Sequence, residues 1–223
     1  MNLKEKKLII FDLDGTLIDS GPDLALSLNA MLKELGHKEF SEDTIHAWVG
    51  NGALTLVTRA LSGSVEIDTT LKSSYVERAL EIFLEHYKKN LCVKTQLYPN
   101  VKKTLQRLHK SKYTLAIVTN KPTAFVPEIL EKLEIAAYFS LILGGDSLSE
   151  KKPSPLPLLH TCKELGFERE EAVMVGDSKN DILAANAASI ESIAVNYGYN
   201  YGEDIRISKP TALIDDFGEI LNL

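Results

Sequence analysis

Two aspartates, Asp12 and Asp14, stand two residues apart directly after the apolar run at 8–11. Alternate residues of a strand point to the same face, so both carboxylates can reach one ligand at the end of such a strand. A carboxylate can attack phosphorus and form an acyl phosphate, which splits ester hydrolysis into two easier steps. The second carboxylate can protonate the leaving alcohol and then deprotonate water. Position alone does not determine which acid attacks, although Asp12 at the strand end is held more rigidly than Asp14 in the turn.

Further polar groups follow later apolar runs of the same kind. Thr119 and Asn120 end one run, Asp177 ends another, and Asp181 comes four residues later. Lys152 stands before a proline cluster. Taken singly, such residues are ordinary turn or helix-cap residues. Because ligands of open α/β sheets bind beyond the carboxyl ends of the strands, we expect all of these groups to gather there with the first two aspartates.

This set of side chains predicts a metal and a substrate group. Carboxylates without a histidine or cysteine among them favour a hard divalent cation, and we expect Mg²⁺. The cation would neutralise charge that otherwise favours protonation of one acid. Phosphate is the natural substrate group, because its charge must be held on several sides. The expected partner is therefore a small phosphorylated molecule.

Five short apolar runs that end in polar residues predict the strands that position these groups. They lie at 8–12, 114–120, 140–146, 172–177 and 192–198. Runs without alternation are typical of strands covered on both faces, as in a parallel sheet. Helical patterns separate most of these runs, so the expected fold class is α/β, with a doubly wound, Rossmann-like parallel sheet as its core.

The interval after the first strand interrupts this alternation. Residues 21–91 contain several amphipathic patterns, such as the apolar stripe from Leu24 to Leu35, and no convincing strand. We therefore expect two domains. Residues 1–20 and 92–223 would form the α/β core, and residues 21–91 an inserted, all-helical cap.

Composition excludes several classes of function. The net charge of −6 comes without a basic stripe, so nucleic acid is not an expected partner. No apolar run approaches the ~20 residues that span a bilayer, and the charged N-terminus lacks a cleavage site for a signal peptide. We expect a cytoplasmic monomer or homodimer that binds neither nucleic acid nor membrane.

Four motifs in this order resemble those of the haloacid dehalogenase superfamily of phosphohydrolases. They are Asp-x-Asp-Gly-Thr at 12–16, a threonine after an apolar strand at 119, lysine before Pro-x-Pro at 152–155, and Gly-Asp-x-x-x-Asp at 176–181. The likeness covers essentially the whole chain. It implies a helical cap that closes over the site and excludes water.

The resemblance also implies a role for each motif residue. Asp12 would be the nucleophile and a Mg²⁺ ligand, and Asp14 the general acid and base with its carbonyl on the metal. Asp177 would be the third ligand. Asp181 would bind the metal through water or would contact the residues that bind it directly. The residues that would hold the phosphoryl group are Thr119, Asn120 and Lys152.

Within the superfamily, the chain resembles the bacterial phosphatases that hydrolyse 2-phosphoglycolate. The likeness includes VGNGA at 49–53 and NYGYNYGED at 196–204. The first stretch lies between two expected cap helices, where such caps place a specificity loop. Gly50 and Asn51 could contact the glycolate carboxylate there, and Arg59 is either its partner or a solvated residue of a helix face. The tyrosine-rich stretch indicates the subgroup without indicating a chemical role.

Other functions remain open at this point. A related phosphatase or a phosphomutase could act on a sugar phosphate, pyrophosphate or a nucleotide with the same two acids. A dehalogenase would not need Asp14. A response-regulator-like module also uses an acidic cluster and a phosphorylated aspartate, but it has no insertion of ~70 residues after its first strand. A non-catalytic interaction protein would not need every motif residue.

Overall fold

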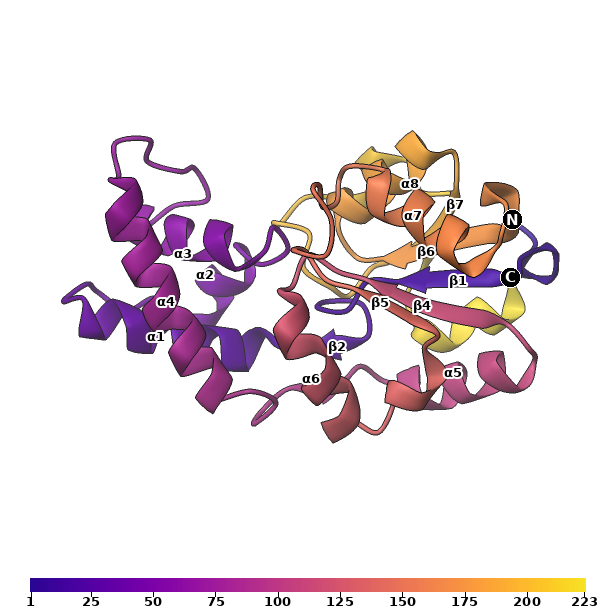
Figure 1. Cartoon of the computed structure of the whole chain (residues 1–223), viewed down its shortest axis with the longest axis horizontal. Helices are drawn as coiled ribbons and strands as arrows, with labels where there is room; N and C mark the ends of the chain where they lie inside the picture. The colour runs from indigo at the N-terminus through magenta and orange to yellow at the C-terminus, as the bar shows by residue number, and fades with distance from the viewer.

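The structure is a computed structural model that describes residues 1–223. A sheet flanked by helices forms one part, and a group of helices lies beside it (Figure 1). Both termini lie at the far end of the sheet part, where the N–H of Leu3 donates to the carbonyl of Leu223 at 3.1 Å. None of the helices combines the length and the apolar character needed to cross a membrane.

Six parallel strands form the main sheet, in the order β5-β4-β1-β6-β7-β8. Their bounds are β1 Leu8–Phe11, β4 Thr114–Val118, β5 Leu141–Leu143, β6 Ala172–Gly176, β7 Glu191–Val195 and β8 Ala212–Ile214. Five of them coincide with the five predicted runs, and the α/β fold class is confirmed. The sixth, β8, was not predicted, because three residues with an exposed Leu213 carry no recognisable pattern.

Helices cover both faces of this sheet, as continuous apolar strands require. Ile9 and Phe11 of β1 pack with α5 and α6 on one face, while Leu8 and Ile10 pack with α7 and α8 on the other. All four β1 residues are fully buried. The helices concerned are α5 (Val101–Lys110), α6 (Val126–Lys132), α7 (Leu156–Leu165) and α8 (Lys179–Ala188). The sheet is therefore a rigid platform for the residues that follow its strands.

Four helices follow the first strand and form what we call the helical insertion. They are α1 (Gly21–Glu34), α2 (Glu42–His46), α3 (Ala53–Ser62) and α4 (Ser73–Lys89). Their apolar residues, among them Leu28, Met31 and Phe83, are buried in a cluster that continues into the sheet part. Gly36 lies two residues after the end of α1 and has φ +76°, a left-handed conformation that glycine adopts without steric cost. The predicted helices are present, while the domain boundaries remain a prediction.

The helical insertion is joined to the sheet part by a short antiparallel ribbon that the sequence did not predict. It pairs β2 (Ile18–Asp19) with β3 (Gln96–Leu97). Next to it, the buried carboxylate of Asp23 accepts hydrogen bonds from the N–H groups of residues 93–95 at 2.9–3.0 Å. The hydroxyl of Thr95 adds another at 2.6 Å. One side chain thus ties the segment that enters the helical insertion to the segment that leaves it.

Candidate active site

Three carboxylates lie together at the carboxyl end of the sheet. Asp12 directly follows β1, Asp177 directly follows β6, and Asp181 lies in the first turn of α8. One oxygen of each lies within 4.8 Å of the others, and all three residues are buried. They meet because β1 and β6 are neighbours in the sheet, in a register that pairs Phe11 with Val175.

One buried lysine compensates part of this negative charge. The Nζ atom of Lys152 lies 2.7 Å from Oδ1 of Asp12 and 2.6 Å from Oδ1 of Asp181. Burial alone would lower the pKa of Lys152, but the two carboxylates outweigh it and raise the pKa. Lys152 is therefore a fixed cation that orients two of the three acids.

The third acid, Asp177, is held by uncharged donors. Its carboxylate accepts from the N–H of Tyr199 at 2.6 Å and from the hydroxyl of Thr16 at 2.7 Å. Burial and the neighbouring carboxylates raise its pKa well above the ordinary value. Burial likewise raises the pKa of Asp12 to about 7, although Lys152 opposes the shift. Three buried carboxylates with one lysine leave excess negative charge, and these oxygen donors fit a hard divalent cation.

The carboxylate of Asp14 lies outside this group of three acids and has its own partners. It accepts from the hydroxyl of Ser20 at 2.5 Å, and the Nζ atom of Lys121 lies 2.8 and 3.0 Å from its two oxygens. Its main chain nevertheless stays close to them, because a Cβ atom on the adjacent Gly15 would collide with the carboxylate of Asp177. Gly15 also has φ +91°, which only glycine adopts freely.

Thr119 and Asn120 follow β4, next to β1, as the sequence predicts. The side-chain amide of Asn120 donates at 3.0 Å to the carbonyls of both Gly50 and Lys152, so it ties the helical insertion to the sheet part. Its carbonyl oxygen is buried without a partner. The main-chain N–H of Asn120 donates to no protein atom and is therefore available to an anion.

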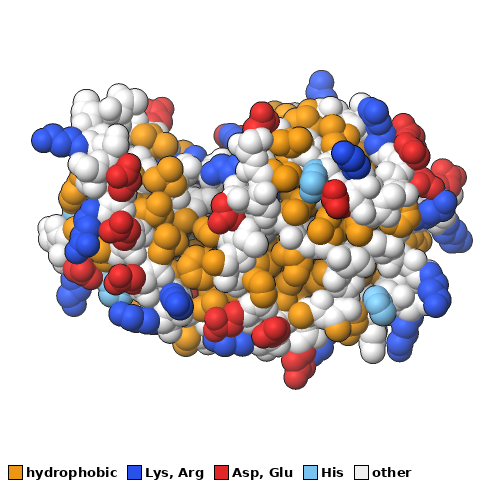
Figure 2. All heavy atoms as spheres, in the orientation of Figure 1, with side chains coloured by type: hydrophobic (Ala, Val, Ile, Leu, Met, Phe, Trp, Pro, Cys, Tyr) orange, Lys and Arg blue, Asp and Glu red, His pale blue; other side chains and the backbone are white.

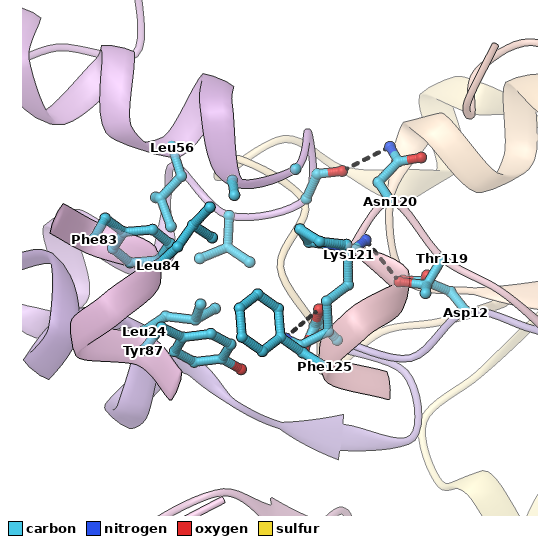
Figure 3. A pocket seen from close by; sticks show the side chains of 16 residues that line it. Asp12, Leu24, Leu56, Phe83, Leu84, Tyr87, Thr119, Asn120, Lys121 and Phe125 are labelled. Atoms are coloured by element: carbon cyan, nitrogen blue, oxygen red, sulfur yellow. Dashed lines mark hydrogen bonds and ion pairs between the residues drawn. The ribbon is translucent and has the colours of Figure 1, made fainter. Parts of the chain in front are cut away.

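A pocket beside the acids lies between the sheet part and the helical insertion (Figure 3). Mostly polar residues of the sheet part line one side, and apolar side chains of the helical insertion line the other. The labelled members are Asp12, Thr119, Asn120, Lys121 and Phe125 from the sheet part and Leu24, Leu56, Phe83, Leu84 and Tyr87 from the helical insertion. In the space-filling view, the two parts are separated by a notch along the upper edge (Figure 2).

Lys121 is the only cationic residue in the pocket lining, a position that the sequence did not predict. Its Nζ atom lies 4.8 Å from the centroid of the Tyr87 ring of α4, in addition to its contacts with Asp14. Burial would lower the pKa of Lys121, but Asp14 outweighs it and the pKa is raised. The stretch VTNKP contains this lysine, yet its pattern alone does not show that the side chain turns into a pocket.

The predicted specificity loop contacts the sheet part through its main chain. The carbonyl of Gly50 accepts from the amides of Asn120 and Asn180 at 3.0 and 3.2 Å, and that of Asn51 accepts from Lys151 at 2.8 Å. Gly50 lines the pocket, whereas the side chain of Asn51 does not. These contacts hold the helical insertion against the sheet part next to the acids.

Arg59 lies outside the pocket lining. Its guanidinium donates to the carbonyl of Trp48 at 2.7 Å and to that of Val65 at 3.1 Å. It also lies 5.3 Å from the ring centroid of Tyr201, in the tyrosine-rich stretch 196–204. This stretch, to which the sequence assigned no role, therefore contacts both the helical insertion, through Tyr201, and Asp177, through the N–H of Tyr199.

Comparisons with known proteins agree with this arrangement. Residues 9–195 match the family model of haloacid dehalogenase-like hydrolases. A phosphoglycolate phosphatase of Colwellia psychrerythraea is 52% identical over 99% of this chain and 98% of its own length. A phosphoglycolate phosphatase of Psychrobacter arcticus is 48% identical over 98% of this chain and 95% of its own length. The crystal structure of a predicted phosphoglycolate phosphatase from Haemophilus somnus has a TM-score of 0.92 and 44% identity, covering 98% of this chain and 97% of that one.

Proposed function

We infer that this chain, which belongs to the haloacid dehalogenase-like hydrolase family, hydrolyses 2-phosphoglycolate to glycolate and phosphate. Relatives named phosphoglycolate phosphatase, 45–52% identical over nearly the full chain, support the substrate. The observation that carries the chemistry is the buried set of Asp12, Asp177 and Asp181 around Lys152. Such a set supplies an oxygen nucleophile, and its excess negative charge fits a divalent cation that would offset the charge of a phosphoryl group.

We propose Asp12 as the nucleophile, because Lys152 orients its carboxylate at the rigid end of β1. One oxygen of Asp12 attacks phosphorus, the bond to the ester oxygen breaks, and the leaving glycolate takes a proton from Asp14. Asp14 then accepts a proton from water as that water attacks the aspartyl-phosphate. Phosphate leaves, and the free Asp12 carboxylate is restored.

Asp14 must turn for this role. In the structure its carboxylate is bound by Ser20 and Lys121 and is not among the three acids that gather around Lys152. Rotation about its side-chain bonds brings it toward the nucleophile, since both residues lie at the same strand end. The general acid is thus held in a resting position until a substrate is bound.

We propose that Thr119, Lys152 and the free main-chain N–H of Asn120 hold the phosphoryl oxygens. Asp12 and Asp177, together with the main-chain carbonyl of Asp14, would hold Mg²⁺, with Asp181 bound to Lys152 behind them. The ion would supply positive charge that lets one anion attack another. Residues 21–91 would act as the cap over the core of residues 1–20 and 92–223, excluding water.

Phosphate release tests this function. The protein is assayed on 2-phosphoglycolate, a sugar phosphate, pyrophosphate and a nucleoside monophosphate, each with Mg²⁺ and with a chelator. We expect 2-phosphoglycolate to have the highest kcat/KM and the chelator to abolish turnover. Comparable rates on all four compounds would contradict the substrate but leave a general phosphatase. Activity undiminished by the chelator would contradict the metal-dependent chemistry.

A further inference from the structure

We propose that Lys121 binds the carboxylate of the substrate and thereby sets the preference for a phosphate ester that carries an acid. The inference rests on the proposed function, because it names the group that recognises the second charge of 2-phosphoglycolate. Lys121 follows Thr119 and Asn120 directly, so its side chain starts from the same strand end that we assign to phosphoryl binding.

The pocket demands a positive charge for such a substrate. Its wall on the side of the helical insertion is apolar, with Leu56, Phe83 and Tyr87 among its members. An ionised carboxylate that enters an apolar space loses its hydration and needs a paired cation or several donors. Lys121 is the cation that the lining offers, and its ammonium already faces the Tyr87 ring of the helical insertion.

The other cations nearby are engaged elsewhere. Lys152 is bound between Asp12 and Asp181. Arg59, which the sequence suggested as a partner for the carboxylate, donates to main-chain carbonyls outside the pocket lining. Lys151 donates to the carbonyl of Asn51 and is also outside the lining. Lys121 is therefore the one lysine or arginine whose partner can be exchanged inside the pocket.

The structure shows Lys121 binding a carboxylate already. Its ammonium donates to both carboxylate oxygens of Asp14, at 2.8 and 3.0 Å. The carboxylate of a bound acid would contact the ammonium in the same way. In 2-phosphoglycolate one ester oxygen and one methylene separate the phosphorus from the carboxylate carbon. The residue that binds this carboxylate must therefore stand close to the nucleophile, and Lys121 lines the same pocket as Asp12.

Two carboxylates would compete for one ammonium. A substrate that brings its own carboxylate takes the place of Asp14 on Lys121, and Asp14 is then free to take up a proton from solvent and turn toward the ester oxygen. An ester without a carboxylate leaves Asp14 in its resting contact. Recognition of the acid and release of the proton-transfer residue are thus the same event, which makes Lys121 a specificity-determining residue.

The test compares two substrates that differ only at this group. Ethyl phosphate replaces the carboxylate of 2-phosphoglycolate by a methyl group and keeps the phosphate ester. We expect the wild type to prefer 2-phosphoglycolate in kcat/KM by ~10²-fold or more, since a buried charged group rejects an analogue that lacks its partner. Lys121→Met should reduce this ratio by at least ~10-fold, and Lys121→Arg should retain more of the preference. The matched control Lys102→Met removes an exposed lysine of α5 and should leave the ratio unchanged.

Each result decides the inference. An equal fall on both substrates in Lys121→Met would show that the lysine only supports the site and would overturn its role in specificity. An unchanged ratio would place the carboxylate elsewhere, with Lys151→Met as the next variant. A wild type without any preference for 2-phosphoglycolate would instead overturn the proposed function, and this inference with it.

Thermal unfolding of each protein identifies a variant that does not fold. A second measurement then tests the inference without that variant. Glycolate and glycolamide have the same shape, but only glycolate carries a charge. We expect glycolate to inhibit the wild type ~10-fold more strongly than glycolamide, and Lys121→Arg to keep that difference. Equal inhibition of the wild type by the two compounds would overturn the inference without any variant.

Discussion

The ammonium of Lys152 lies 2.7 Å from a carboxylate oxygen of Asp12, with both residues buried at the carboxyl end of the sheet. This contact fixes the direction of the acid that we propose as the nucleophile. It also places positive charge beside the point where a phosphoryl group would arrive. The reactivity of the site therefore depends on a small number of buried charges whose removal has distinct, measurable effects.

Removal of the nucleophile should stop turnover. Asp12→Asn keeps the size of the side chain, but an amide cannot attack phosphorus, so we expect kcat to fall by ~10³-fold or more. Phosphate release measures the loss, and mass spectrometry of acid-quenched protein detects the phosphorylated wild type. The control Asp43→Asn changes an exposed acid of α2 and should retain full activity. Near-normal turnover in Asp12→Asn would refute the covalent mechanism.

The effect of Asp14→Asn should depend on the leaving group. Without a proton donor, release of glycolate should slow by ~10²–10⁴-fold. An aryl phosphate such as p-nitrophenyl phosphate has a leaving group that needs no proton, so its cleavage should slow much less. Steady-state and pre-steady-state assays on both substrates measure the contrast. Equal losses on both would assign Asp14 a role other than proton transfer to the leaving group.

The stabilisation of the protein by Mg²⁺ should grow with pH. Burial raises the pKa of Asp12 to about 7 and that of Asp177 well above its ordinary value. Without metal, the folded state therefore retains protons that the unfolded chain has already released, and the two acids reduce stability as pH rises toward their folded pKa values. Mg²⁺ must displace those protons at low pH, so its binding is weaker there.

Thermal unfolding with Mg²⁺ and with a chelator, at about pH 5 and about pH 8, measures this linkage. We expect a larger rise in Tm at the higher pH. The variant Asp43→Asn provides a control with the three buried acids intact. A rise in Tm that is equal at both pH values, or greater at the lower one, would show that these acids do not bind the ion.

Asp23 should be important for stability rather than chemistry. Asp23→Ala leaves the N–H groups of residues 93–95 near the ribbon without their acceptor. Thr95 is buried while Val93 and Lys94 are exposed, and a buried donor that loses its partner costs ~1–3 kcal/mol, so we expect the free energy of unfolding to fall by about 1–3 kcal/mol. Urea denaturation measures it, with Asp43→Asn as the matched control. A loss below about 1 kcal/mol would show that water replaces the carboxylate there.

The sequence predicts the strands that carry the acids because those strands are buried on both faces. An uninterrupted apolar run such as Leu8–Phe11, bounded by charged residues, is typical of a buried strand, and the aspartate that ends it marks the sheet edge. The ribbon of β2 and β3 and the strand β8 escaped prediction. Segments of two or three residues contain no periodicity, and their pairing depends on neighbours distant in sequence.

For the site, chain position predicts which acids reach the sheet edge but not where their side chains turn. Asp12 and Asp177 meet because their strands are adjacent. The direction of Asp14 depends on Lys121 and Ser20, and the burial of Lys121 depends in turn on Tyr87 of the helical insertion. Such contacts form only after both parts of the chain have packed, so no local pattern encodes them.

The ribbon of β2 and β3 places the two ends of the helical insertion side by side. A segment that begins and ends at neighbouring points can be lengthened, shortened or exchanged for another without moving the sheet. The apolar wall of the pocket belongs to that exchangeable segment, whereas the reacting acids belong to the sheet. The size of the accepted ester can therefore diverge between descendants of one ancestor while the reaction itself is inherited unchanged.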